Sequence, residues 1–387
     1  MLKGKKIGLL PKIIIAILLG VLFSLFMPLG VTRIFETINS LFSNYLGFVI
    51  PLIILGLVAP SIGDLGGRAG KMLIITTLIA YGSTIFSGYM SYFVSTASFP
   101  SLLHGESMSS LDAIDKTAVM PYFTVEMPPL LSVTSALVLA FVLGLTLANC
   151  KGRGETIAST IKEFKDLVMI IIEKSIIPLL PLYIFGIFLK LGVEGEVATV
   201  LGLFIKVIAL IFAMHICLLL IQFCIAGAIT KRNPLRALVR MIPAYLTALG
   251  TQSSAATIPI TLKCAKENGV RDDIAEFVVP LCATIHLSGS ILKIVACTLA
   301  IAWTTGMPTD IELYTPYILM LGITMVAAPG VPGGAIMAAL ALLTSQLGFT
   351  EMQLGLMIAL YIAMDSFGTA GNVTGDGAIA MVVNRYL

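Results

Sequence analysis

Charged residues are scarce in this sequence. Only 12% of the 387 residues are Asp, Glu, Lys or Arg, and the chain has three histidines and one tryptophan. Soluble domains have about 25% charged residues, so a sizeable soluble domain is excluded. The formal net charge of +3 is too small for a nucleic-acid-binding surface or a polybasic lipid-binding segment. The partners of this chain are therefore expected inside the lipid bilayer, with no nucleic acid among them.

Cysteine pairs at metal-binding or redox spacing are also missing. The cysteines show no C-x-x-C pair and no histidine at the spacing of a metal site, and most lie within apolar runs: Cys150, Cys217, Cys224, Cys264, Cys282 and Cys297. Such cysteines behave as small apolar side chains. We therefore interpret them as inert thiols of the protein core.

Long apolar runs are abundant. Apolar residues make up 58% of the chain, against about 45–50% in soluble domains, and a membrane-spanning helix needs about 20 of them in sequence. The first run follows a basic N-terminal segment but no small-residue cleavage site, so we interpret it as an uncleaved span. Six ordinary spans are predicted at about residues 12–30, 38–62, 71–98, 128–149, 167–191 and 198–228.

Basic residues mark alternate connections between these spans. They occur in the N-terminal segment and in the second, fourth and sixth connections, for example at Lys5, Arg68, Lys151 and Lys231. Short loops rich in Lys and Arg stay in the cytoplasm. The pattern predicts a multi-pass protein of the cell inner (plasma) membrane with both termini in the cytoplasm.

Two unusual segments follow the sixth span. Residues 246–260 are rich in small and hydroxyl-bearing side chains and have basic residues on both sides, so both ends should face the cytoplasm. Residues 328–334 contain two prolines and three glycines, which forbid a continuous helix. Irregular backbone is tolerated at membrane depth only where protein covers it or it lines a cavity. We therefore predict two re-entrant helical hairpins, at about 232–264 and 314–348, in preference to soluble loops.

Each hairpin is followed by a further span, at about 273–304 and 353–383. The seventh span is interrupted at residues 286–290, where Gly289 and two serines can release backbone carbonyls, which bind cations. A hairpin with a helix thus occurs twice, entering from opposite sides of the membrane. This inverted repeat predicts a binding site between the hairpin tips, near the middle of the membrane. The predicted fold is an all-α membrane protein with eight transmembrane helices and two re-entrant helical hairpins.

Polar residues form a stripe along the last span. At about 100° per residue, Asp365, Thr369, Asn372 and Asp376 fall within roughly a 60° arc of the helix. Each carboxylate in a transmembrane helix costs about 2.5–3.5 kcal/mol, so each needs a cationic partner. The candidates are an alkali cation, a substrate ammonium, a proton, or Lys293. A purely structural ion pair with Lys293 is the alternative that the sequence leaves open.

Three motifs carry a resemblance to a known family. They are Ser253-Ser-Ala-Ala-Thr-Ile-Pro259 in the first hairpin, Gly330-Val-Pro-Gly333 in the second, and Asn372-Val-Thr-Gly-Asp376 in the last span. In this order and on these elements, they resemble the dicarboxylate/amino acid:cation symporter family, which has the glutamate-transporter fold, over essentially the whole chain. The sequence is similar to a divergent member.

The resemblance implies a homotrimer with an elevator mechanism. A scaffold and trimerisation part would comprise residues 1–66 and 128–192, and a transport domain would comprise residues 67–98 and 193–387. The transport domain would slide against the scaffold, and the second hairpin would serve as its gate.

The resemblance also implies roles for single residues. Asp365 would hold the substrate ammonium, Thr369 and Asn372 its polar groups, and Ser254 with its neighbours its carboxylate. The candidate substrate-binding residues are Ser253, Ser254, Ser290, Lys293, Gly333, Asp365, Thr369 and Asn372. The candidate Na⁺-binding residues are Cys282, His286, Asn372 and Asp376.

Two departures from the family pattern bear on the substrate. Acidic-amino-acid transporters carry an Arg where this chain has Gly368, and some members carry a hairpin Arg where it has Gln252. Bidentate Arg is the usual partner of a carboxylate. We therefore predict a small neutral amino acid as substrate. The alternative is an acidic amino acid or dicarboxylate with Lys293, which stands where the family often has an aromatic residue, as its counter-charge.

A third departure bears on the coupling ion. The family motif Asn-Met-Asp-Gly-Thr appears here as His286-Leu-Ser288-Gly-Ser290, without its acidic residue and therefore without one sodium site. We expect coupling to one or two sodium ions or to a proton, with His286 or Lys293 substituting for a cation, and no other cofactor.

Two other function classes are disfavoured. An intramembrane hydrolase using His286 with Ser288 or Ser290 would need residues that face roughly opposite ways on a helix, so we predict that the chain is not an enzyme. A passive channel would need a continuous pore, whereas facing hairpins suit an occluded site.

Overall fold

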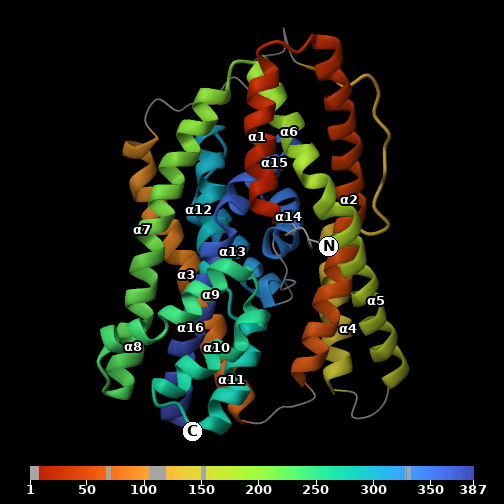
Figure 1. Cartoon of the computed structure of the whole chain (residues 1–387). Helices are drawn as coiled ribbons and strands as arrows, with labels where there is room; N and C mark the ends of the chain where they lie inside the picture. The colour runs from red at the N-terminus through yellow and green to blue at the C-terminus, as the bar shows by residue number, and fades with distance from the viewer. Residues whose placement is uncertain (1–7, 67–70, 104–118, 150–153, 327, 329–332) are drawn as a thin grey trace, which may run out of the picture.

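The computed structural model describes residues 8–66, 71–103, 119–149, 154–326, 328 and 333–387. Within these ranges every regular element is a helix (Figure 1), and no strand occurs. The all-helical prediction is confirmed for this part of the chain.

Long apolar helices dominate the structure. Five segments are long and apolar enough to cross a membrane: Leu29–Pro60, Lys71–Leu102, Glu155–Val193, Val197–Thr230 and Asp272–Thr304. A sixth results if the bent pair Glu351–Ala363 and Asp365–Tyr386 forms one span. The chain is therefore a multi-pass membrane protein. The helices α1 (Leu9–Ser24) and α4 (Val133–Asn149) lie at the first and fourth predicted spans and are shorter.

The remaining helices of the first half follow the predicted spans closely. They are α2 (Leu29–Gly66), α3 (Lys71–Leu102) and α7 (Val197–Thr230). The fifth predicted span begins earlier than expected, because α5 (Glu155–Ile171), the π-helical turn η1 (Ile172–Ile176) and α6 (Ile177–Val193) follow one another without a break.

The first hairpin consists of three helices. They are α8 (Pro234–Arg240), α9 (Ile242–Thr251) and α10 (Ser254–Glu267), and α9 packs against α10. The chain turns at Gln252, which has a left-handed φ of 53°, uncommon for a residue with a side chain. Ser253 then caps α10, since its side chain accepts a hydrogen bond from the Ala256 N–H at 3.2 Å.

The second hairpin consists of α13 (Ile311–Val326) and α14 (Gly334–Leu347), which pack against each other. Gly333 caps α14 with a φ of +76°, a conformation that favours glycine. The motif residues 330–332 lie outside the described residues. The predicted gate is therefore described by its two helices, by Ala328 and by Gly333.

The seventh span is interrupted, as predicted, but over a shorter stretch. Helix α11 (Asp272–Ile285) ends and α12 (Ser288–Thr304) begins with only His286 and Leu287 between them. Ser288, Gly289 and Ser290 belong to the first turn of α12. The expectation that these three residues form the break was wrong, because the amide of Asn372 accepts from the N–H groups of Gly289 and Ser290 and so caps the helix there.

The eighth predicted span consists of two helices. Helices α15 (Glu351–Ala363) and α16 (Asp365–Tyr386) meet at Met364 with a bend of 60°. No glycine or proline lies at this point. The Met364 carbonyl accepts a hydrogen bond from Lys293 Nζ at 3.1 Å, in addition to those from the Phe367 and Gly368 N–H groups.

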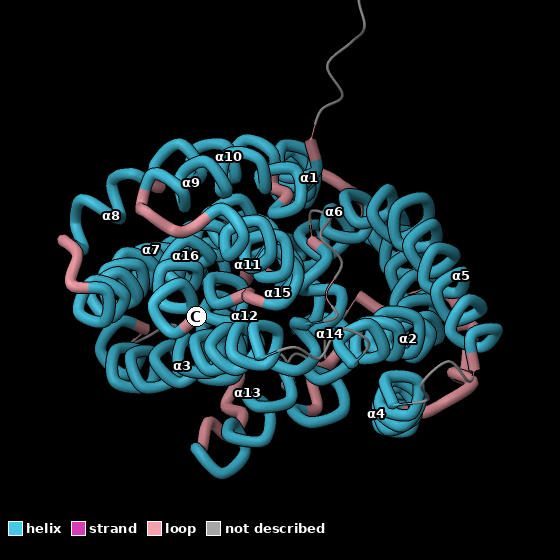
Figure 2. Tube along the Cα trace, turned by 90° about the horizontal axis from the view of Figure 1, so that it is seen from below, coloured by secondary structure: helices cyan, strands magenta, loops and turns pink. Residues whose placement is uncertain are grey.

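The helices pack in two groups, which Figures 1 and 2 show from two directions. In one group α2 packs against α4, α5 and α6, and α1 packs against α6. In the other, α16 packs against α7, α9, α11 and α12, and α3 packs against α12 and α13. Both groups leave large apolar side chains exposed, such as Leu18 in the first and Leu78 in the second, as expected for helices that face lipid.

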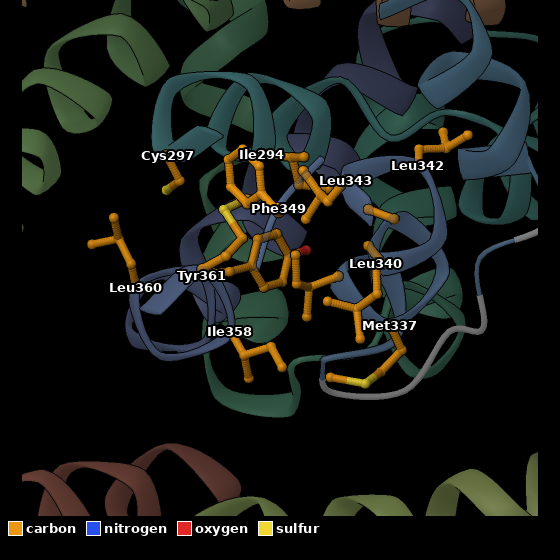
Figure 3. Close-up of a cluster of buried hydrophobic side chains, with 14 of the residues drawn as sticks. Ile294, Cys297, Met337, Leu340, Leu342, Leu343, Phe349, Ile358, Leu360 and Tyr361 are labelled. Atoms are coloured by element: carbon orange, nitrogen blue, oxygen red, sulfur yellow. The ribbon is translucent and has the colours of Figure 1, made fainter. Parts of the chain in front are cut away.

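An apolar core joins α12, α14 and α15 (Figure 3). Ile294, Leu340, Leu343 and Ile358 are buried there, and Tyr361 points its ring into the same cluster. The contact between α12 and α16 is closer still, since a methyl group on Gly289 would lie 2.6 Å from the Gly368 carbonyl oxygen. Small residues allow such approach in membranes. The two interrupted spans are thereby held against each other.

Candidate functional site

A small cavity lies where Gln252 and Ser254 of the first hairpin and Ala328 and Ala335 of the second meet the breaks of the last two spans. Its volume is ≈ 40 Å³, and a single water needs about 10–15 Å³, so it has room for only a few water-sized groups. The lining residues come from both hairpins and from α11, α12, α15 and α16: Gln252, Ser254, Ala283, Leu287, Ser290, Ala328, Ala335, Tyr361, Asp365, Thr369 and Asn372.

Four helix N-termini converge on this cavity. Helix α10 begins at Ser254, α12 at Ser288, α14 at Gly334 and α16 at Asp365, and each contributes a cavity-lining residue in its first turn. The first N–H groups of a helix have no partner within it and carry a positive partial charge. These N-termini favour a negatively charged group in the cavity, although the described lining already contains the carboxylate of Asp365.

Asp365 connects the cavity to the second hairpin. Its side chain is 9% exposed, and Oδ2 accepts a hydrogen bond from the Gly333 N–H at 2.7 Å. Oδ1 lies 3.6 Å from Lys293 Nζ. Both carboxylate oxygens are thus engaged, one by the hairpin tip and one by an ammonium group.

Lys293 is buried behind the cavity and does not line it. Besides Asp365, its Nζ contacts the Met364 carbonyl and lies 3.9 Å from the centre of the Tyr361 ring, a cation–π distance. A methyl group on Gly368 would collide with both Cε and Nζ of Lys293. The ammonium group therefore occupies the space that a side chain at position 368 would need.

Asn372 and Thr369 line the cavity but also have structural partners. Asn372 Oδ1 accepts from the Gly289 N–H at 2.8 Å and the Ser290 N–H at 3.3 Å, and Nδ2 donates to Ser290 Oγ at 3.1 Å. Thr369 Oγ1 donates to the Asp365 carbonyl at 3.2 Å. The Asn372 side chain fixes α12 against α16, whatever else it binds.

The second carboxylate of the polar stripe lies apart from the cavity lining. Asp376 Oδ1 is 2.9 Å from His286 Nδ1, and both side chains are buried. His286 Nε2 is 3.1 Å from Ser83 Oγ. Gln222 Nε2 donates to both Ser83 Oγ and Ser288 Oγ at 3.1 Å. A hydrogen-bonded network thus links Asp376 to α3 and α7.

The predicted cation-binding residues gather around this network. Helix α11, which carries Cys282, packs against α16, and the Cys282 carbonyl accepts the His286 N–H at 2.9 Å. Among the described residues, no group of three His, Cys, Asp or Glu side chains could hold a metal ion. A cation here would be bound by one carboxylate and by backbone carbonyls, which suit alkali ions rather than transition metals.

Ser83, His286 and Asp376 are hydrogen-bonded in the order serine, histidine, aspartate, as in a hydrolase triad. The sequence did not predict that Asp376 would orient His286. However, Ser83 lies in the middle of α3, where backbone N–H groups are bonded within the helix. A helix interior offers no pair of N–H groups to stabilise an oxyanion. The arrangement therefore lacks what acyl transfer requires.

Sequence reasoning missed Tyr361 and two serines of α3, which contribute to the site. Tyr361 places its ring over Lys293 and its hydroxyl 3.4 Å from Ser290 Oγ, but an aromatic residue in an apolar run is not conspicuous. Ser87 and Ser91 of α3 donate to the carbonyls of Ser288 and Leu292 at 2.6 and 2.7 Å. Their four-residue spacing, shared with Ser83, is a helical stripe that periodicity could have revealed.

Comparison with known proteins gives consistent matches. The chain is 27% identical over 386 residues to the serine/threonine transporter SstT of Acinetobacter baumannii (strain AYE), covering 96% of this chain and 95% of that protein. It is 28% identical over 262 residues to the neutral amino acid transporter B(0) of Rattus norvegicus, covering 66% of this chain and 46% of that protein. Both are transporters and not enzymes. Residues 9–386 match the sequence model of the sodium:dicarboxylate symporter family, and the chain belongs to that family.

Proposed function

We propose that this chain is a secondary active transporter that takes up a small neutral amino acid, coupled to the movement of sodium, protons or both. The observation that carries the proposal is the cavity between the hairpin tips, where one buried carboxylate faces several helix N-termini. A carboxylate binds an ammonium group, and helix N-termini bind a carboxylate. Together they match the two charges of an amino acid.

The binding pose follows from this division of charge. The ammonium group is placed on Asp365, and the substrate carboxylate on the N-terminus of α10 with the hydroxyls of Ser254 and Ser290. Thr369 and Gln252 are then available to form hydrogen bonds with a polar side chain of the substrate, such as one that carries a hydroxyl group. The size of the cavity, ≈ 40 Å³, favours small substrates.

A neutral side chain is favoured over an acidic one. None of the described residues that line the cavity carries a positive charge, and a second carboxylate would need one. Lys293, the counter-charge in the alternative, is directed at Asp365. The names of the relatives, a serine/threonine and a neutral amino acid transporter, agree with a neutral substrate.

The coupling ion is assigned to the neighbourhood of Asp376. A sodium ion would be bound by this carboxylate together with backbone carbonyls near Cys282, His286 and Asn372. A proton would instead be shared between Asp376 and His286, which already form a hydrogen bond. The family description names sodium, which favours sodium as one coupling ion.

The same family relationship supports an elevator in a homotrimer. We assign residues 1–66 and 128–192 to the scaffold and residues 67–98 and 193–387 to the moving transport domain. The grouping of α2 with α4, α5 and α6, and of α16 with α3, α7, α9, α11 and α12, agrees with this division. The packing of α1 and α6 against α15, and of α2 and α4 against α14, would be among the contacts that slide.

A ligand screen tests the proposal. The purified protein should be stabilised against heat by L-serine, L-threonine or L-alanine, and more strongly in sodium than in choline, because a ligand stabilises the state that it binds. At about 100 times Kd the expected gain is about 2.7 kcal/mol. Stabilisation by L-aspartate or succinate alone would contradict the neutral-amino-acid assignment.

A further inference from the structure

We infer that Lys293 is a tethered counter-cation that keeps Asp365 neutralised in the empty carrier, so that the carrier can return across the membrane without substrate. The inference rests on the proposed function and goes beyond it, because it predicts net uptake rather than obligatory exchange. It also assigns to Lys293 a positioning role that differs from substrate binding.

The ammonium group of Lys293 has a complete set of partners without any ligand. Its three N–H bonds can serve the Met364 carbonyl at 3.1 Å, Asp365 Oδ1 at 3.6 Å and the Tyr361 ring at 3.9 Å. The side chain is 1% exposed. Gly368 leaves the space that this arrangement requires. The pair is therefore a built feature of the fold and not a chance contact of flexible side chains.

Charge explains why the pair matters for the empty carrier. Asp365 must cross the membrane whether or not substrate is bound, and a buried carboxylate without a partner is strongly disfavoured. In the loaded carrier the substrate ammonium can neutralise it. In the empty carrier Lys293 does so, and it travels with Asp365 because α12 and α16 pack together.

The hairpin contact supplies the second requirement for return. Gly333 at the start of α14 donates its N–H to Asp365 Oδ2 at 2.7 Å without a ligand in the cavity, so the second hairpin is already attached to α16. The cavity beside this contact has a volume of ≈ 40 Å³. The empty site is thus neutralised by Lys293 and attached to the second hairpin through Gly333.

The test compares net uptake with exchange in proteoliposomes. Uptake of radiolabelled L-serine is measured under inward sodium and proton gradients into empty vesicles, and into vesicles preloaded with unlabelled L-serine. The wild-type protein should perform both. Lys293→Met should keep exchange but lower the ratio of net uptake to exchange by at least about tenfold, because only the loaded carrier remains neutralised.

A second variant displaces Lys293 without removing it. In Gly368→Ala the new methyl would collide with Cε and Nζ of Lys293, so the same ratio should fall, and this variant decides the matter if Lys293→Met does not fold. Gly377→Ala on the same helix is the matched control, since its methyl meets only the flexible side chain of Met241. Its ratio should equal that of the wild type.

Several outcomes would overturn the inference. They are exchange without net uptake in the wild type, an unchanged ratio in both variants, or a parallel loss of net uptake and exchange in both. A wild-type protein that moves L-serine in neither assay would instead contradict the proposed function, so the two failures are distinguishable.

Discussion

Replacing Asp365 by Asn should weaken binding of L-serine by at least about 30-fold, the equivalent of about 2 kcal/mol. The carboxylate faces the cavity and is buried, so the substrate ammonium would lose its only anionic partner among the described lining residues. Isothermal titration of the purified variant measures the affinity. Asp273→Asn, whose side chain is 69% exposed, is the matched control and should bind as the wild type does.

The same variant leaves a buried ammonium unpaired, so it should also be less stable. Breaking a buried ion pair costs about 3–5 kcal/mol. The double variant Asp365→Asn with Lys293→Met removes both charges and should recover much of the lost Tm without recovering affinity. Should affinity return together with stability, Asp365 would be a structural residue, and the placement of the ammonium group would be wrong.

Replacing Asp376 by Asn should leave binding of L-serine nearly intact at saturating ion concentration but raise the concentration of the coupling ion that binding requires. Asp376 does not line the cavity, and its partner is His286 at 2.9 Å. Loss of one carboxylate from a cation or proton site should lower the apparent ion affinity by at least about tenfold. Uptake measured under separate sodium and proton gradients identifies which ion is affected.

A different pattern would contradict this assignment. If Asp376→Asn lost substrate binding as completely as Asp365→Asn and kept its response to both gradients, the two carboxylates would not have separate roles. There would then be no reason to assign a coupling ion to the carbonyls near Cys282 and Asn372.

The sequence predicted the all-helical class and the family, and both predictions are confirmed. Of the eight candidate substrate-binding residues, Ser254, Ser290, Asp365, Thr369 and Asn372 line the cavity, and Ser253, Lys293 and Gly333 do not. The helical period of the last span placed Asp365, Thr369 and Asn372 on one face, whereas Ser254 and Ser290 were assigned through the resemblance to the family. The roles of these residues remain proposals.

What the sequence could not predict depends on contacts between distant segments. The bend at Met364 has no local cause and coincides with a hydrogen bond from Lys293, 71 positions away in the sequence. Tyr361 contributes through its ring and hydroxyl, neither of which distinguishes it from a core residue. The pairing of His286 with Ser83 depends on the packing of α3 against α11, which no periodicity specifies.

The most direct measurement is a structure of the protein in lipid nanodiscs with L-serine and sodium. The proposal places the amino acid between the two hairpin tips, with its ammonium group on Asp365 and its carboxylate at the N-terminus of α10 near Ser254. An amino acid bound elsewhere, or bound there with its carboxylate toward Lys293, would contradict it.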